Sequence, residues 1–372
     1  MRSVETFHAD LDNVPTVQAA DPLAADPICA QLPAMNHRAD LTALVGGLRS
    51  VLPELATVPG FTVVEALAAM RDLGFFLASI RRHGPEPVVL LPEATPVLLA
   101  LGEHTDMVPR DTILHYTAWN PTGPRQRRYT DDVQEDHLQE SVRMVYTDVY
   151  HGIETCAELH AMTPTDPAFG SLMNEFADRL AVLVGSMNYT LEHVSPRFFA
   201  EGLRPYLESV QVAGHDYFGP AAAQVPLWLI DEATWSADRP DPQYESFWRA
   251  LVPYALPRWR EHHARWDGRP SIVTRLVAAS VAEPDSAVLR AAAEATVRAL
   301  RTIVTFRGRH LGIASQVYEL ETQEYSTGSG GGSVDLLREI MNLTKLNARL
   351  VRQSAGDPPR QVVPPARPGS RS

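Results

Sequence analysis

A histidine inside an otherwise apolar helical pattern is the first residue whose type and setting could do chemistry. In the stretch LRTIVTFRGRHLGIASQVY, His310 shares one helical face with Phe306 and Ile313, because residues three and four apart lie on the same side of a helix. Its imidazole would point into an apolar interior. It is either a histidine satisfied within the core or a neutral axial ligand to haem, with Arg307 and Arg309 as cations for the propionates.

A run of glycines, TGSGGGS, follows at residues 327–333. Glycine allows positive φ and lets backbone N–H groups approach an anion, so the run could hold a carboxylate or a propionate ahead of the last helix. A flexible linker is the simpler interpretation. The run is not a dinucleotide fingerprint, because it follows a helix and a polar stretch rather than a strand.

Other histidines offer competing candidates. His215, in AGHDYFGP, is the main rival axial ligand, and His115 and His151 could be distal residues that hydrogen-bond bound oxygen or peroxide. His262 and His263 are adjacent, so on a helix they diverge and cannot easily bind one metal. We expect both of these last two on the surface.

Composition excludes several classes of function. The net charge is −12, which argues against a nucleic-acid-binding face. Lys345 is the only lysine, so a bound anion would be held by arginine, histidine or backbone N–H groups. Two cysteines are too few for a disulfide framework or a cysteine metal site. We expect no membrane span, because no apolar stretch is long enough, and a cytoplasmic protein, because the N-terminus lacks the apolar core of a signal peptide.

The sequence periodicity predicts that helices position these residues. Apolar residues repeat at three and four from Arg38 to about Ile80, and helices dominate from residue 131 onward. Residues 136–162 and 166–194 each predict one long amphipathic helix. A helix capped at Asp285 or Ser286 runs through His310, and Ser333 can cap the last helix. We predict an all-α chain with a smaller N-terminal domain (1–130), a larger helical domain (131–354) and a disordered tail (355–372).

Together, the histidine helix and the glycine run resemble the indoleamine 2,3-dioxygenase family. The resemblance implies an indoleamine 2,3-dioxygenase-like helical haem domain, with His310 as the proximal iron ligand and a glycine loop over the substrate. The implied cofactor-binding residues are His310, Arg307 and Tyr318, and the implied loop residues at the substrate are Gly328, Ser329 and Gly330.

A second stretch, VSPRFFAEGLRPYL, resembles the segment of that family that binds the amino-acid substrate. The resemblance implies that Phe199 packs on the aromatic ring and that Arg204 pairs with the carboxylate. Both roles suit the chemistry of the side chains, because a guanidinium binds a carboxylate bidentately and an aromatic ring packs on an aromatic wall.

Two further stretches resemble the family only in part. In YFGPAAAQVP, Gln224 matches, whereas Ala221, Ala222 and Val225 stand where the family has other residues, including its serines. The segment ILHYTAWNPTG sits where the family has an aromatic distal segment, and Tyr116 matches it best.

These departures favour a side branch, and the branch resembled most is that of monodechloroaminopyrrolnitrin synthase. It implies a non-covalent haem b, since Ala314 stands where a covalently tethering cysteine occurs in some relatives. The expected enzyme oxidises or rearranges an aromatic amino acid, tryptophan or a modified tryptophan, with O2 or peroxide in bacterial secondary metabolism. A homodimer is left open.

Three alternatives remain at this point. A haem-dependent tyrosine hydroxylase would place His115 or His151 close to the iron. A haem sensor without turnover would fill both axial positions, for example with His310 and His215. The third is an all-α interaction protein without a cofactor. In that case the resemblances of the His310 stretch and of the Arg204 stretch to the family would be coincidental.

Overall fold

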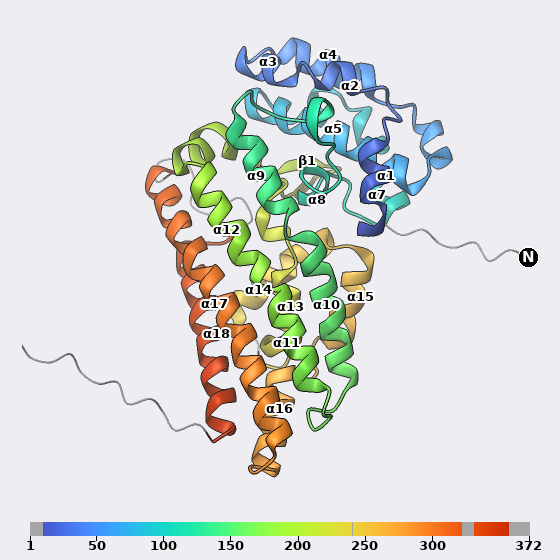
Figure 1. Ribbon diagram of the computed structural model, residues 1–372. Coiled ribbons are helices and arrows are strands. Elements are labelled where there is room, and N and C mark those ends of the chain that lie inside the picture. Colours follow the sequence, from blue (N-terminus) through green and yellow to red (C-terminus); the bar gives the residue numbers. More distant parts are fainter. Residues whose placement is uncertain (1–9, 240, 322–330, 357–372) are drawn as a thin grey trace, which may run out of the picture.

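Helices make up almost all of the described chain in the computed structural model, which describes residues 10–239, 241–321 and 331–356 (Figure 1). The all-α prediction is therefore confirmed. None of the described helices is both long and apolar enough to cross a membrane.

The N-terminal part consists mostly of short helices around one long one, α5, which is buried along most of its length. Thr62 and Glu65 start α5 with a capping box, in which each side chain bonds the backbone N–H of the other residue. The elements of this part are η1 (Leu11–Asn13), α1 (Val14–Ala19), α2 (Asp26–Cys29), α3 (Leu32–His37), α4 (Leu41–Val51), η2 (Leu55–Gly60), α5 (Val63–His83), α6 (Pro87–Leu90), α7 (Ala94–Thr105), α8 (Ile113–Tyr116) and η3 (Gly123–Arg125).

The larger part is a bundle of long helices beneath the N-terminal helices in Figure 1. Its elements are α9 (Val133–Arg143), α10 (Tyr146–Ala161), α11 (Phe169–Arg179), α12 (Ala181–His193), η4 (Phe198–Leu203), η5 (Arg204–Tyr206), β1 (Val210–Val212), β2 (His215–Tyr217), η6 (Ala222–Gln224), α13 (Leu227–Asp231), η7 (Glu232–Ser236), α14 (Pro242–Leu251), η8 (Val252–Tyr254), α15 (Pro257–Trp266), α16 (Ile272–Ala282), α17 (Ala287–Glu321) and α18 (Val334–Ser354).

The helix that carries His310, α17, is the longest described element and runs the length of the bundle. It packs against α11, α12, α16, α18 and the π-helix η4. The predicted cap of the last helix is confirmed, because the Ser333 hydroxyl accepts a hydrogen bond from the Leu336 backbone N–H.

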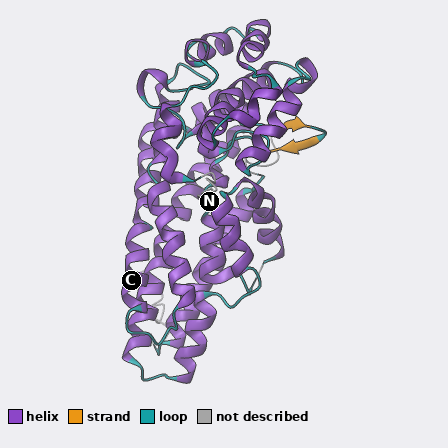
Figure 2. Cartoon of the chain, turned by 90° about the vertical axis from the view of Figure 1, so that its right-hand side faces the viewer, coloured by secondary structure: helices purple, strands orange, loops and turns teal. Residues whose placement is uncertain are grey.

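The predicted long amphipathic helices are each broken in two. The first breaks at Met144 and Val145, between α9 and α10, and the second breaks at Leu180, between α11 and α12. Neither break carries glycine or proline, so nothing in the local sequence marks it. Sequence reasoning also missed the antiparallel hairpin of β1 and β2, which turns at Ala213 and Gly214 with positive φ (Figure 2).

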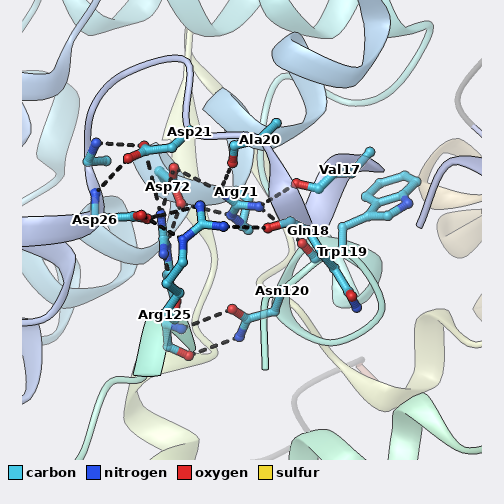
Figure 3. A network of polar contacts seen from close by, with 12 residues as sticks. Val17, Gln18, Ala20, Asp21, Asp26, Arg71, Asp72, Trp119, Asn120 and Arg125 are labelled. Carbon is cyan, nitrogen blue, oxygen red and sulfur yellow. Dashed lines mark hydrogen bonds and ion pairs between the residues drawn. The ribbon is translucent and has the colours of Figure 1, made fainter. Parts of the chain in front are cut away.

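A buried ion network ties the N-terminal segment to the core (Figure 3). Asp72 is fully buried and accepts hydrogen bonds from Arg71 Nε at 2.8 Å and Arg127 Nε at 2.9 Å. Arg71 in turn donates to the carbonyl oxygens of Val17 and Trp119. One carboxylate thus holds two guanidinium groups that bind neighbouring chain segments.

A second buried carboxylate lies in the first turn of α9. Glu135 is fully buried and accepts hydrogen bonds from the backbone N–H groups of Tyr129 and Thr130 and from the Tyr116 hydroxyl at 3.1 Å. Burial raises its pKa to about 7, although these hydrogen bonds act in the opposite direction.

Replacing Asp72 should destabilise the fold strongly. Asp72→Ala leaves two buried guanidinium groups without their shared carboxylate, and we expect a loss of about 3–5 kcal/mol in the free energy of unfolding. Arg49→Ala is the control, because Arg49 lies 3.8 Å from Glu93 with a side chain 60% exposed, and should cost less than about 1 kcal/mol. Urea unfolding measures both variants; equal losses would contradict the assigned role of Asp72.

Glu135 should make stability fall with rising pH. Because its pKa is raised from 4.5 to about 7 on folding, the folded protein binds the proton more tightly than the unfolded chain. Its contribution is complete below the unfolded pKa and is lost as pH rises through 7, by up to roughly 3 kcal/mol. Urea unfolding across this pH range should show that loss in the wild type and not in Glu135→Gln. Parallel pH profiles of the two proteins would refute the assignment.

Candidate active site

His310 lies on α17 as a neutral, half-buried imidazole. Its ring stacks on Phe306 one turn earlier, with centroids 5.9 Å apart, and Ile313 on the same face is also half-buried. Desolvation, assisted by the nearby charge of Arg307, lowers the pKa of His310 to about 4. Within the described ranges, no hydrogen bond reaches either ring nitrogen. The imidazole therefore offers a lone pair from an apolar helix face that the protein covers only in part.

Arg307, one turn before His310, is held in a buried ion pair. Its guanidinium pairs with Asp231 of α13 and donates to the Thr344 hydroxyl of α18 at 2.5 Å. Asp231 also accepts hydrogen bonds from the Tyr244 hydroxyl at 2.5 Å and Trp235 Nε1 at 3.0 Å. This cluster fixes the rotation of α17 at the turn that presents His310. Sequence reasoning missed Asp231, because it lies in a nearly continuous apolar run.

Phe199 and Arg204 lie on a segment that packs against α17. Phe199 is half-buried in the π-helix η4, and Arg204, which follows directly in η5, is 6% exposed. A π-turn inserts one extra residue into the helix and redirects the side chains after it, and such turns are frequent at functional sites. The structure thus brings the predicted substrate segment against the helix that carries His310.

The alanine-rich segment between β2 and α13 is anchored between these parts. The Gln224 amide accepts a hydrogen bond from the Ile113 backbone N–H at 2.8 Å and donates to the Gly219 carbonyl at 2.9 Å. Gly219 lies directly against the backbone, since a Cβ there would be 2.4 Å from the Leu207 carbonyl oxygen. Gln224 therefore joins this segment to the start of α8, where His115 lies.

His115 is a buried hydrogen-bond donor without an acceptor. Its Nδ1 accepts the Thr112 backbone N–H at 3.0 Å, so the neutral ring carries its proton on Nε2. That Nε2 is buried and has no hydrogen-bond partner in the described chain. Burial, with a smaller effect of Arg71, lowers the pKa of His115 to about 3. Trp119 packs edge-on against the ring at 4.7 Å.

Tyr116 and His151, two of the residues expected on the distal side, have different surroundings. Tyr116 is only 2% exposed, with its ring stacked on Tyr129 and its hydroxyl bonded to Glu135. His151 is exposed on α10, and α11 lies between α10 and α17 (Figure 1).

The other candidate histidines, His215, His262 and His263, do not share the surroundings of His310. His215 is exposed on the hairpin strand β2. The prediction that His262 and His263 are both on the surface is wrong, because His262 is buried and bonds Glu154 at 3.1 Å. His263 is half-buried and bonds the buried Glu232 at 2.9 Å. The tryptophans around both histidines in the sequence were the missed signal of burial.

The predicted glycine loop is described only at its end. Gly328, Ser329 and Gly330 lie outside the described residues. Gly331 has a φ of +79°, which favours glycine, and the Tyr318 hydroxyl donates to the Gly332 carbonyl. The end of the loop is therefore tied back to the helix that carries His310, two turns after that residue.

Comparison with known families assigns the chain to one of them. A family model described as monodechloroaminopyrrolnitrin synthase PrnB matches residues 14–355, which include the His310 helix, the Arg204 segment and the start of the last helix. The match spans nearly the whole chain, and the family is one of oxidative enzymes, which supports an oxidoreductase. The chain therefore belongs to the monodechloroaminopyrrolnitrin synthase PrnB family, within the indoleamine 2,3-dioxygenase-like haem superfamily.

Proposed function

We propose that this chain is a haem-dependent oxidoreductase that oxidises or rearranges tryptophan or a modified tryptophan in bacterial secondary metabolism, with O2 or peroxide as oxidant. The observation that carries the proposal is His310, a neutral imidazole with no hydrogen bond from the described chain, on a helix face beside the Arg204 segment.

The residues present fit a haem group. His310 would be the proximal ligand, and a neutral imidazole on a rigid helix has the required donor chemistry. Desolvation and the charge of Arg307 would keep the imidazole unprotonated, and the Asp231–Arg307 pair would hold the helix turn that carries it. Haem b, held without a covalent link because Ala314 has no thiol, would supply the redox chemistry of its iron. We keep Arg307 and Tyr318 as cofactor-binding residues in this proposal.

The substrate would be held by its carboxylate and its ring. Arg204 is a buried guanidinium, which can bind a carboxylate bidentately where water does not compete. Phe199 would form an aromatic wall for the ring. The loop of Gly328, Ser329 and Gly330 would then cover the substrate and exclude water.

His115 favours a second candidate reaction, hydroxylation of tyrosine. Its buried Nε2–H without an acceptor is the type of donor that can hold an oxygen ligand or peroxide. The same donor would also suit an oxygenase that acts on tryptophan. The two reactions are therefore distinguished by which amino acid, tyrosine or tryptophan, the enzyme converts. The sensor alternative finds no support in His215, which is exposed on β2.

Removing the proposed iron ligand should abolish haem binding. In His310→Ala, we expect loss of the Soret band and a haem affinity lower by about a hundredfold or more, because even indirect partners of a ligand contribute up to that much. His310→Gly should regain the band when imidazole is added. His37→Ala, an exposed histidine, is the control and should bind haem normally. An unchanged spectrum in His310→Ala contradicts the proposal.

Neutralising Arg204 should weaken binding of the substrate carboxylate. For Arg204→Gln we expect L-tryptophan affinity to fall about 10–100-fold, because a charge-assisted bidentate pair is lost. Affinity for L-tryptophanamide, which lacks the carboxylate, should change little. Titrations followed by absorption or calorimetry measure both, with the exposed Arg197→Gln as control. An equal loss for acid and amide would assign Arg204 to structure instead.

A further inference from the structure

Three tyrosines from separate segments form one stack beside the Arg204 segment. The rings of Tyr116 and Tyr129 are 5.6 Å apart at 17°, and those of Tyr129 and Tyr206 are 4.9 Å apart at 8°. All three side chains are buried. Tyr206 lies in η5, two residues after Arg204, whereas Tyr116 lies in α8 inside the N-terminal part. The stack therefore joins the proposed substrate segment to the interior.

Among the described residues, the inner end of the stack has a direct base. The Tyr116 hydroxyl donates to Glu135 Oε1 at 3.1 Å, whereas the Tyr129 hydroxyl is buried without a hydrogen-bond partner in the described chain. A phenol that loses an electron in a low-dielectric interior must also lose its proton, because an unpaired buried charge is costly. Tyr116 is the member of the stack that can do so directly.

Glu135 is suited to accept and return this proton. Burial raises its pKa to about 7, so both its charged and neutral forms are accessible near neutrality. Its other oxygen bonds the Tyr129 and Thr130 backbone N–H groups, which hold the carboxylate in place during the transfer.

We propose that Tyr206, Tyr129 and Tyr116 form a one-electron relay that stores an oxidising equivalent on Tyr116. A one-electron oxidant at the Arg204 end, such as a metal centre oxidised by peroxide, gains one electron through the stack. Tyr116 loses that electron, its O–H bond breaks, and the proton passes to the Glu135 carboxylate. The products are a neutral Tyr116 phenoxyl radical, protonated Glu135 and the oxidant reduced by one electron. When an electron returns to Tyr116 and the proton returns from Glu135, the phenol and the carboxylate are restored.

The relay rests on the proposed function only for the source of its oxidant. It would let the site discharge an oxidising equivalent when no substrate is bound, so that exposed side chains are not oxidised. The competing interpretation is a stack that serves core packing alone, and oxidation from a chosen point on the surface separates the two without haem.

To test the relay, a ruthenium photo-oxidant is attached to the cysteine of the full-length Ser209→Cys variant. This position is three residues after Tyr206. Both natural cysteines are buried, so the label reacts at the introduced one. Flash oxidation should give a tyrosyl radical in electron paramagnetic resonance, assigned by ring-deuterated tyrosine. Adding Tyr116→Phe should remove it, and adding Glu135→Gln should lower its yield by about a hundredfold. Tyr146→Phe, another buried tyrosine, should leave it unchanged.

A measurement on the unmutated stack covers the case in which a variant fails to fold. In D2O, the phenoxyl oxygen should carry a hydrogen-bonded deuteron donated by Glu135, distinct from any amide deuteron of the neighbouring Gln139. Absence of a tyrosyl radical, a radical that persists in Tyr116→Phe, or a radical without that deuteron would each overturn the relay. Because the experiment needs no haem, these outcomes leave the assignment of His310 untouched, and failure to bind haem leaves the radical result standing.

Discussion

The buried pair of Asp231 and Arg307 is the interaction on which the site depends most. It joins α13 to α17, with Thr344 adding α18 and Tyr244 adding α14. Removing one member would leave the other as an uncompensated buried charge, at a cost of about 3–5 kcal/mol. The same pair lies one turn from His310, where the guanidinium helps keep the imidazole neutral. One contact thus joins these helices and adds to the effect of desolvation on the His310 imidazole.

The N-terminal part adds a second set of buried polar groups. Asp72 organises two guanidinium groups, Glu135 holds the start of α9, and Gln224 joins α8 to the alanine-rich segment. These contacts place a donor, His115, and an aromatic stack against the larger helical bundle. Buried hydrogen bonds thus hold α8 in the N-terminal part, whereas η4 packs against α17 in the bundle.

Periodicity was sufficient to predict the fold class, the course of α17 and the cap at Ser333. The breaks in the two long helices could not be predicted, because Met144, Val145 and Leu180 are ordinary helix formers and tertiary packing decides there. At the site, motif resemblance found Arg204, Phe199 and His310, which the structure places on two segments in contact. It missed Asp231, since a lone acid in an apolar run has no periodic signal, and it did not indicate that Tyr116 is buried in an aromatic stack.

The proposal that His310 binds the iron of a haem on the apolar face of α17 can be checked in a crystal structure of the chain reconstituted with haem. We expect continuous density between the iron and Nε2 of His310, with the Asp231–Arg307 pair intact behind the ligand. Iron bound by another side chain, or haem bound away from α17, would contradict it.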